Sequence, residues 1–172
     1  MKPSEREDIL KVYRIAVRNA IASRNSEVVS NSSPQHASII IEEMLDAAKD
    51  RFIAFSGAFR DDVWNALVID ALRRALRRGV EISLVATETT DRIPEELKNV
   101  SFVVNKEQLE KEEQEVRDLC GYHFAVADGC VVRVEYDLKQ RLAAFSANRP
   151  DVANVLIDHF LRIRNISRRI VA

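Results

Sequence analysis

The sequence predicts an α/β fold: a mixed, mostly parallel sheet with helices on both faces and a β-hairpin late in the chain. Up to Leu119, segments with helical periodicity alternate with short apolar runs, which favours strands joined by helices. The last third instead holds two β-prone runs separated by Asp128-Gly129, a dipeptide typical of two-residue hairpin turns. Apolar residues make up 47% of the 172 residues, which is enough for a substantial core.

Helical periodicity and end signals define the expected helices, which are 4–22, 34–48, 61–78, 106–119 and 150–170, with one further turn near Pro94. Ser33 is expected as the N-cap before Pro34 at the first helical position. Asp61 and Asp62 are expected to open the third helix, and Gly79 is expected to end it.

Short β-prone runs define the expected strands, which are 27–30, 51–56, 80–86, 100–105, 122–127, 130–136 and 142–145. In a two-residue hairpin, Phe124 lies opposite Arg133 and Tyr122 lies opposite Glu135. This register places His123 on the other face of the hairpin, beside small side chains. Arg133 and Glu135 are then expected to pair with each other or with a partner.

Composition and charge limit the classes of protein. Residues 1–26 are expected to form an N-terminal helix packed on a single domain, residues 27–172. The net charge of -1 does not argue for nucleic acid or membrane, although 19 of the 26 basic residues are arginine. Cys120 and Cys130 fit a reducing cytoplasm and cannot make a zinc site alone. No apolar stretch approaches the ~20 residues of a membrane helix, so a cytoplasmic protein is expected.

Three segments resemble one domain of the phospholipase D-like superfamily over residues 27–166. They are SSPQHASIIIEEMLDAAKDRFIAFSG, ALRRALRRGVEISLVATE and GYHFAVADGCVVRVE. The resemblance implies an HxKxxxxD motif on the first hairpin strand and a Gly-Ser pair on the second. In active members the histidine attacks phosphorus and the lysine holds phosphate oxygens. Two such domains meet at one shared site, so the resemblance also implies a homodimer or another protein partner.

Most of this motif is missing from the sequence. With Asp128 at the motif aspartate, Gly121 takes the nucleophile position and His123 the lysine position, while Glu135 replaces the glycine of the Gly-Ser pair. In the alternative register His123 takes the nucleophile position, but Ala125 then replaces the lysine. Loss of the nucleophile costs a hydrolase roughly six orders of magnitude in rate.

The function predicted from these residues is a catalytically degenerate domain that binds or scaffolds, in a setting such as a bacterial nucleic-acid or defence complex. One alternative is a divergent metal-independent phosphodiesterase or nuclease that uses His123. Another is a regulator whose degenerate pocket binds a nucleotide or other anion, with His123 in the pocket. The structural alternative for His123 is a core histidine hydrogen-bonded to the backbone. No residue spacing suggests a metal or cofactor.

Further candidate positions have structural explanations beside the functional ones. Ser146 and Asn148 echo a Ser-x-Asn sequence of the family, although they lie too far downstream for a simple match. The segment 56–58 ends a strand, where α/β sheets bind ligands, but a plain turn is favoured. Ser33 and His36 open a helix, where capping explains the serine. Two arginine clusters could contact phosphates or a protein partner; they are Arg73, Arg74, Arg77 and Arg78, and Arg162, Arg164, Arg168 and Arg169.

Overall fold

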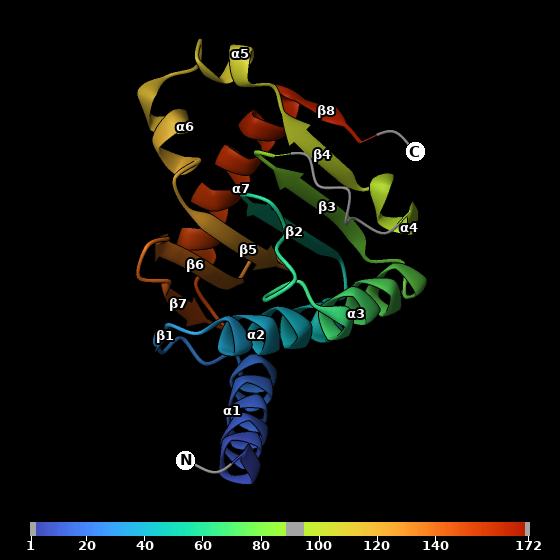
Figure 1. The fold of residues 1–172 in the computed structure, drawn as a ribbon, viewed down its shortest axis with the longest axis vertical. Coiled ribbons are helices and arrows are strands. Elements are labelled where there is room, and N and C mark those ends of the chain that lie inside the picture. The colour runs from blue at the N-terminus through green and yellow to red at the C-terminus, as the bar shows by residue number, and fades with distance from the viewer. Residues whose placement is uncertain (1–2, 89–94, 171–172) are drawn as a thin grey trace.

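A computed structural model describes residues 3–88 and 95–170 of the protein, and its central feature is one open sheet (Figure 1). The eight strands lie in the order β1-β7-β6-β5-β2-β3-β4-β8. The strands are β1 (Val29–Asn31), β2 (Arg51–Ser56), β3 (Glu81–Ala86), β4 (Ser101–Val104), β5 (His123–Ala127), β6 (Val131–Asp137), β7 (Leu142–Ser146) and β8 (Ser167–Arg169). The helices are α1 (Pro3–Ser23), α2 (Pro34–Ala47), α3 (Ala66–Arg77), α4 (Glu95–Lys98), α5 (Lys106–Leu109), α6 (Gln114–Leu119) and α7 (Pro150–Asn165).

The predicted mixed α/β sheet with helices on both faces is confirmed, but the prediction that it is mostly parallel is wrong. In the described part of the chain only β2·β3 and β3·β4 pair in parallel, whereas five other pairings are antiparallel. For the β5·β6 and β6·β7 pairings, the physical reason is the length of the connections. Strands β5, β6 and β7 follow one another through short turns, and a short turn can join only antiparallel neighbours.

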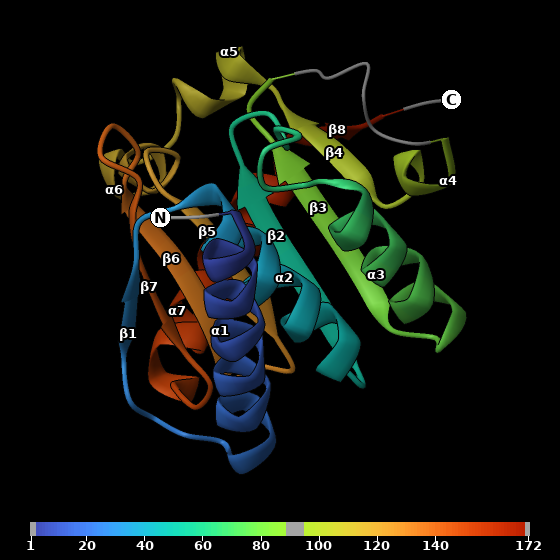
Figure 2. The ribbon, with the colours of Figure 1, turned by 60° about the horizontal axis from the view of Figure 1, so that its bottom comes forward.

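Helices cover the two faces of the sheet unequally. Figure 2 shows α2 and α3 in front of the strands and α7 behind them. Successive strand residues point to opposite faces. Phe52 and Leu84 therefore join the core under α2 and α3, while Phe55 and Val85 join the core under α7. No helix of the described residues has both the length and the apolar character needed to cross a membrane.

The first helix lies on α2 and protrudes from the body of the molecule (Figure 1). Ion pairs join the two helices: Arg18 lies 2.9 Å from Glu43, and Arg14 lies 3.1 Å from the same carboxylate. The predicted helix is confirmed, although some of its apolar side chains remain in solvent. Val17 is buried, whereas Val12 is 67% exposed.

Two predicted helices differ from the observed ones. The third begins at Ala66 and not at Asp61, because Asn65 caps it by accepting the N–H groups of Leu67 and Val68 over 3.0 and 3.3 Å. The segment between Asp61 and Asn65 is instead a turn that packs Trp64 into the core. The charged stretch 106–119 forms two short helices, α5 and α6, rather than one.

The C-terminal helix also ends earlier than predicted. It stops at Asn165, and the following residues form β8 beside β4, with Arg169 opposite Phe102. Arg164 and Arg169 both lie over the Phe102 ring, at 5.0 and 5.5 Å from its centroid. These cation–π contacts stabilise the strand that the sequence pattern did not reveal.

Asp128-Gly129 lies at the β5–β6 turn, as predicted, but the predicted register is wrong by one residue. The turn contains three residues, because Ala127 pairs with Val131. Asp128 and Gly129 both take the left-handed backbone conformation, with φ of 48° and 66°. Consequently Arg133 lies opposite Ala125, and Glu135 lies opposite His123. The face of His123 is therefore polar, which the two-residue turn did not predict.

The Asp128 carboxylate fixes this turn to the preceding chain. Its two oxygens accept the backbone N–H groups of Lys49, Asp50 and Arg51 over 2.9, 3.0 and 3.0 Å. These residues connect α2 to β2, so one side chain joins the hairpin to the central strand. Asp128 thus has a structural role at the end of β5 away from His123.

We expect Asp128→Asn to lower the free energy of unfolding by about 1–2 kcal/mol, because a charged acceptor of three N–H groups is lost. Asparagine tolerates the left-handed backbone, so the change isolates the hydrogen bonds. Urea denaturation measures the difference. Asp137→Asn is the matched control, since Asp137 accepts two N–H groups only within its own exposed turn; it should cost less than about 0.5 kcal/mol. Equal losses would contradict the assigned role.

Candidate binding site

The end of β2 and the start of β5 meet at one edge of the sheet. Because β5 runs antiparallel to β2, Phe124 lies beside Phe55 and His123 lies near the chain that leaves β2. The next residues after β2, Gly57 and Ala58, continue along this edge. Ligands commonly bind at the carboxyl ends of strands in α/β sheets.

His123 is held between two partners at this edge. The Gly57 N–H donates to Nε2 of His123 over 3.0 Å, so Nε2 carries no proton and a neutral ring holds its proton on Nδ1. Nδ1 lies 3.8 Å from Oε2 of Glu135. A Cβ at residue 57 would stand 3.2 Å from Nε2, so glycine permits the close approach of the backbone. The half-buried ring is fixed in one orientation.

Arg133 forms the floor of the site and is only 4% exposed. Its NH1 and NH2 lie 3.5 and 3.4 Å from Oε2 of Glu135, and NH2 lies 3.4 Å from Oδ1 of the buried Asn31. Its Nε has no protein partner among the described residues. A guanidinium carries five N–H donors. Arg133 therefore has more donors than these long contacts satisfy.

Glu135 is ionised at neutral pH. Burial raises the pKa of its carboxyl, but contact with His123 and the charge of Arg133 lower it, and the pKa lies below its ordinary value. Burial lowers the pKa of the Arg133 guanidinium, and the Glu135 charge opposes this shift. Because arginine stays protonated in proteins, the two groups form an ion pair removed from bulk water.

A cavity of about 310 Å³ lies over these side chains, within the size range of ligand pockets. Its wall includes the apolar side chains of Ile41, Val63, Trp64 and Leu138. Further charged groups come from the chain after β2 and from the β6–β7 turn. Arg141 and Asp62 lie 2.7 Å apart and join these two segments.

Solved structures with this architecture place the chain in a known fold. Nuc from Salmonella typhimurium, a phospholipase D family member, superposes with a TM-score of 0.59 at 17% identity, over 85% of this chain and 99% of that chain. NucT from Helicobacter pylori gives 0.57 at 8% identity, over 83% and 99%. The whole of a phospholipase D family member is thus matched by one continuous domain. The chain has a phospholipase D-like fold.

A third solved structure is similar to nearly the whole of this chain. TrmBL2, an archaeal chromatin protein described with a novel mode of DNA binding, gives a TM-score of 0.60 at 12% identity. That match covers 97% of this chain and 62% of TrmBL2. No family model matches the sequence, and no curated protein matches it.

The phospholipase D-like domain brings only some of the predicted site residues together. His123 and Glu135 line the same cavity. Gly121 is exposed in the turn before β5, where an added Cβ would stand 3.0 Å from the Asp118 carbonyl oxygen. Its neighbour Tyr122 is also exposed.

Ser146 and Asn148, which echo the Ser-x-Asn sequence of the family, do not lie on the His123 surface. Ser146 pairs with Val132, which belongs to the core under α7, so its side chain lies on the other face of the sheet. Its hydroxyl donates to the Ser26 carbonyl over 3.1 Å. Asn148 follows β7 at the same end, near the Asp128 turn rather than near His123.

Sequence reasoning missed several cavity residues. The segment 56–58 was interpreted as a plain turn, yet Ser56, Gly57 and Ala58 all line the cavity. Trp64, the single tryptophan of the chain, lines it as well. The signal that could have identified these residues is their position directly after the buried strand at 51–56. The predicted helix start at Asp61 hid this signal for Trp64, because it placed Trp64 inside a helix. Arg141 had no sequence signal, because only the fold brings the β6–β7 turn to this edge.

The arginine clusters are largely engaged within the protein. Arg162 lies 2.8 Å from Glu113, and Arg74 lies 2.8 Å from Asp46. Arg78 donates to the Leu45 carbonyl over 2.6 Å. Because Arg168 lies on β8 and Arg162 on α7, the predicted C-terminal arginine cluster on one helix is wrong.

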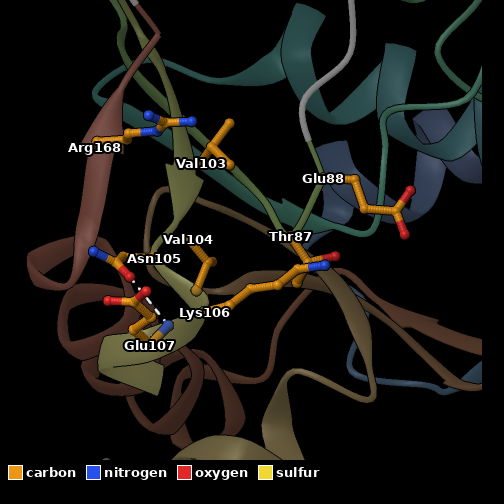
Figure 3. Close-up of a pocket in the computed structure, with 8 residues that line it drawn as sticks. All are labelled: Thr87, Glu88, Val103, Val104, Asn105, Lys106, Glu107 and Arg168. Carbon is orange, nitrogen blue, oxygen red and sulfur yellow. Dashed lines mark hydrogen bonds between the residues drawn. The ribbon is translucent and has the colours of Figure 1, made fainter. Parts of the chain in front are cut away.

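A second cavity, of about 510 Å³, lies beside β4 and β8 (Figure 3). Arg168 lies beside Val103, and Lys106 extends toward Thr87. Glu88 and Glu107 also line it. Its charged side chains are all exposed, whereas Arg133 and Glu135 are withdrawn from solvent. The His123 cavity is therefore the better candidate for a binding site.

Nitrogen-15 NMR should show the Nδ1–H tautomer of His123 wherever its ring is neutral, because Nε2 accepts the Gly57 N–H. Gly57→Ala should disturb this assignment, since its Cβ would crowd Nε2. His36, in the first turn of α2, serves as an internal control that should not change. A proton on Nε2 of His123 in the wild type would contradict the assigned geometry.

Proposed function

We propose that this phospholipase D-like domain binds a small ligand in the His123 cavity and does not cleave phosphodiesters. The observation that carries the proposal is the hydrogen bond from Gly57 to Nε2 of His123. A histidine nucleophile attacks phosphorus through an unoccupied ring lone pair. In His123 the Nε2 lone pair is occupied, and Nδ1 carries the proton and faces Glu135.

The surrounding charges support the same proposal. Cleavage needs positive groups that stabilise the charge developing on the phosphate oxygens. The family resemblance instead assigns Gly121 to the nucleophile position and Glu135 near the phosphate. An ionised Glu135 repels the substrate, and it also neutralises Arg133.

The size and lining of the cavity support binding over scaffolding alone. A purely structural degenerate site would fill with side chains, since protein interiors are close-packed. Here about 310 Å³ remains beside the buried Arg133, whose Nε has no protein acceptor among the described residues. The rival enzyme hypothesis requires His123 to break the Gly57 hydrogen bond before it can react.

Purified protein is expected to show no metal-independent turnover of bis(p-nitrophenyl) phosphate above the buffer rate. His123→Ala is expected to give the same rate as the wild type, because the imidazole has no catalytic role. Release of p-nitrophenol measures both rates. Turnover by the wild type that disappears in His123→Ala would establish the rival enzyme hypothesis.

We also propose a cytoplasmic homodimer, as the resemblance to paired domains implies. Tyr122 and Tyr136 support an interface beside the site, since they flank His123 and Glu135 in sequence and are 36% and 49% exposed. Tyrosine is enriched at protein interfaces. DNA is the other partner class, which the likeness to TrmBL2 raises. The ion pair of Arg162 and others like it argue against DNA, because a paired arginine releases no phosphate counterion.

Light scattering at several concentrations is expected to give twice the mass of one chain, and Tyr122→Glu with Tyr136→Glu is expected to give the single-chain mass. Two buried carboxylates on each copy would repel across the interface. Arg162→Glu with Arg169→Glu is the control for the surface around α7 and should leave the dimer intact. A monomer at all concentrations, or dissociation by the arginine changes alone, would contradict this interface.

A further inference from the structure

We infer that Glu135 sets the charge of the cavity so that it accepts uncharged polar ligands and excludes phosphate and other anions. The inference rests on the proposed function, because it assumes that the His123 cavity binds a ligand. It goes further by naming the class of ligand and the residue that selects it.

The charged groups of the cavity balance. Three arginines and three carboxylates line it, and they are Arg60, Arg133, Arg141, Asp62, Glu88 and Glu135. Four of them form two ion pairs: Arg141 with Asp62 at 2.7 Å, and Arg133 with Glu135 at 3.4 Å. Nε2 of His123 accepts the Gly57 N–H and so is already engaged within the protein. The cavity therefore offers no excess positive charge to a phosphate.

Among the three carboxylates, Glu135 contributes most to the charge balance in the deep part of the cavity. Its side chain is 13% exposed, and it lies beside the buried guanidinium that an anion would need. Charges withdrawn from solvent are screened much less than surface charges. Asp62 lies at the rim with a side chain that is 36% exposed, so its charge is better screened. An anion at Arg133 would meet Glu135 at close range.

An uncharged polar ligand fits the same groups without this cost. A ligand oxygen can accept from the guanidinium of Arg133, which lines the cavity. A hydroxyl or amide N–H can donate to Glu135. Val63, Trp64 and Leu138 supply apolar surface for the rest of the ligand. A few polar groups among apolar walls are typical of small-molecule sites.

Trp64 makes the inference measurable, because it is the only tryptophan and it lines the cavity. Inorganic phosphate is titrated into the wild type and into Glu135→Gln while Trp64 fluorescence is followed, with calorimetry as a second readout. The wild type should not bind phosphate at millimolar concentration. Glu135→Gln leaves one positive charge in excess and should bind phosphate at least about tenfold more tightly. Glu81→Gln, at an exposed position outside the cavity, is the matched control and should behave as the wild type.

Neutral and phosphorylated partners extend the test. Adenosine and AMP, and glucose and glucose 6-phosphate, differ only by the phosphate. The wild type should bind AMP no more tightly than adenosine, and glucose 6-phosphate no more tightly than glucose. In Glu135→Gln the affinity for the phosphorylated compound, relative to its unphosphorylated counterpart, should rise by at least about tenfold. Asp62→Asn removes a carboxylate at the rim and should shift the balance in the same direction but less. If Glu135→Gln does not fold, Asp62→Asn therefore still tests whether removing a carboxylate raises the affinity for phosphate.

Two results would overturn the inference: tight phosphate binding by the wild type, or no gain in phosphate affinity when the carboxylates are removed. Neither result depends on catalysis. Hydrolysis of a phosphodiester by the wild type would instead remove the proposed function. Equilibrium binding and turnover thus separate the two failures.

Discussion

The three-residue turn at residues 128–130 determines which side chains of β5 and β6 share a face. The Asp128 carboxylate holds this turn against the backbone of Lys49, Asp50 and Arg51. A one-residue change of register would move every side chain of one strand to the other face. In the observed register Glu135 lies opposite His123. The cavity, its ion pair and its charge balance all follow from this pairing.

The same constraint determines which side chains this phospholipase D-like fold brings together at the His123 cavity. The sheet still brings the start of β5 to the end of β2, so a cavity forms at this edge. The polar groups inside it bind to one another: the Gly57 N–H donates to His123, and Glu135 forms an ion pair with Arg133. Buried polar groups that find partners within the protein stabilise one arrangement of the site. An arrangement of this kind is the basis of the proposal that the site recognises a ligand and does not attack phosphorus.

Much of the fold could be predicted from the sequence because the signals were local. The cap at Ser33, the buried strand at 51–56 and the left-handed Gly79 all depend on adjacent residues, and the structure contains each of them. The α3 start was missed because Asp61 and Asn65 are both good caps, and only the packing of Trp64 decides between them. Strand β8 was missed because it depends on the distant Phe102.

The candidate site was harder to predict, because it depends on contacts between distant segments. His123 was recognised from its motif position, but its partner Glu135 was assigned to the wrong face, since Asp-Gly favours a two-residue turn. Asp128 also contacts a segment almost eighty residues earlier, and no local pattern reveals that contact. Arg141 reaches the cavity for the same kind of reason, through its pair with Asp62.

His123 is held between Gly57 and Glu135 with its Nε2 lone pair occupied, and is therefore predicted not to act as a nucleophile. A histidine that attacks a phosphodiester becomes covalently attached to phosphorus, and that bond survives in alkaline solution. Intact-mass spectrometry after exposure to a reactive phosphodiester and an alkaline quench tests this step directly. Only the unmodified 19.6 kDa chain is expected. A phosphorus adduct that maps to His123 and is absent in His123→Ala would contradict it.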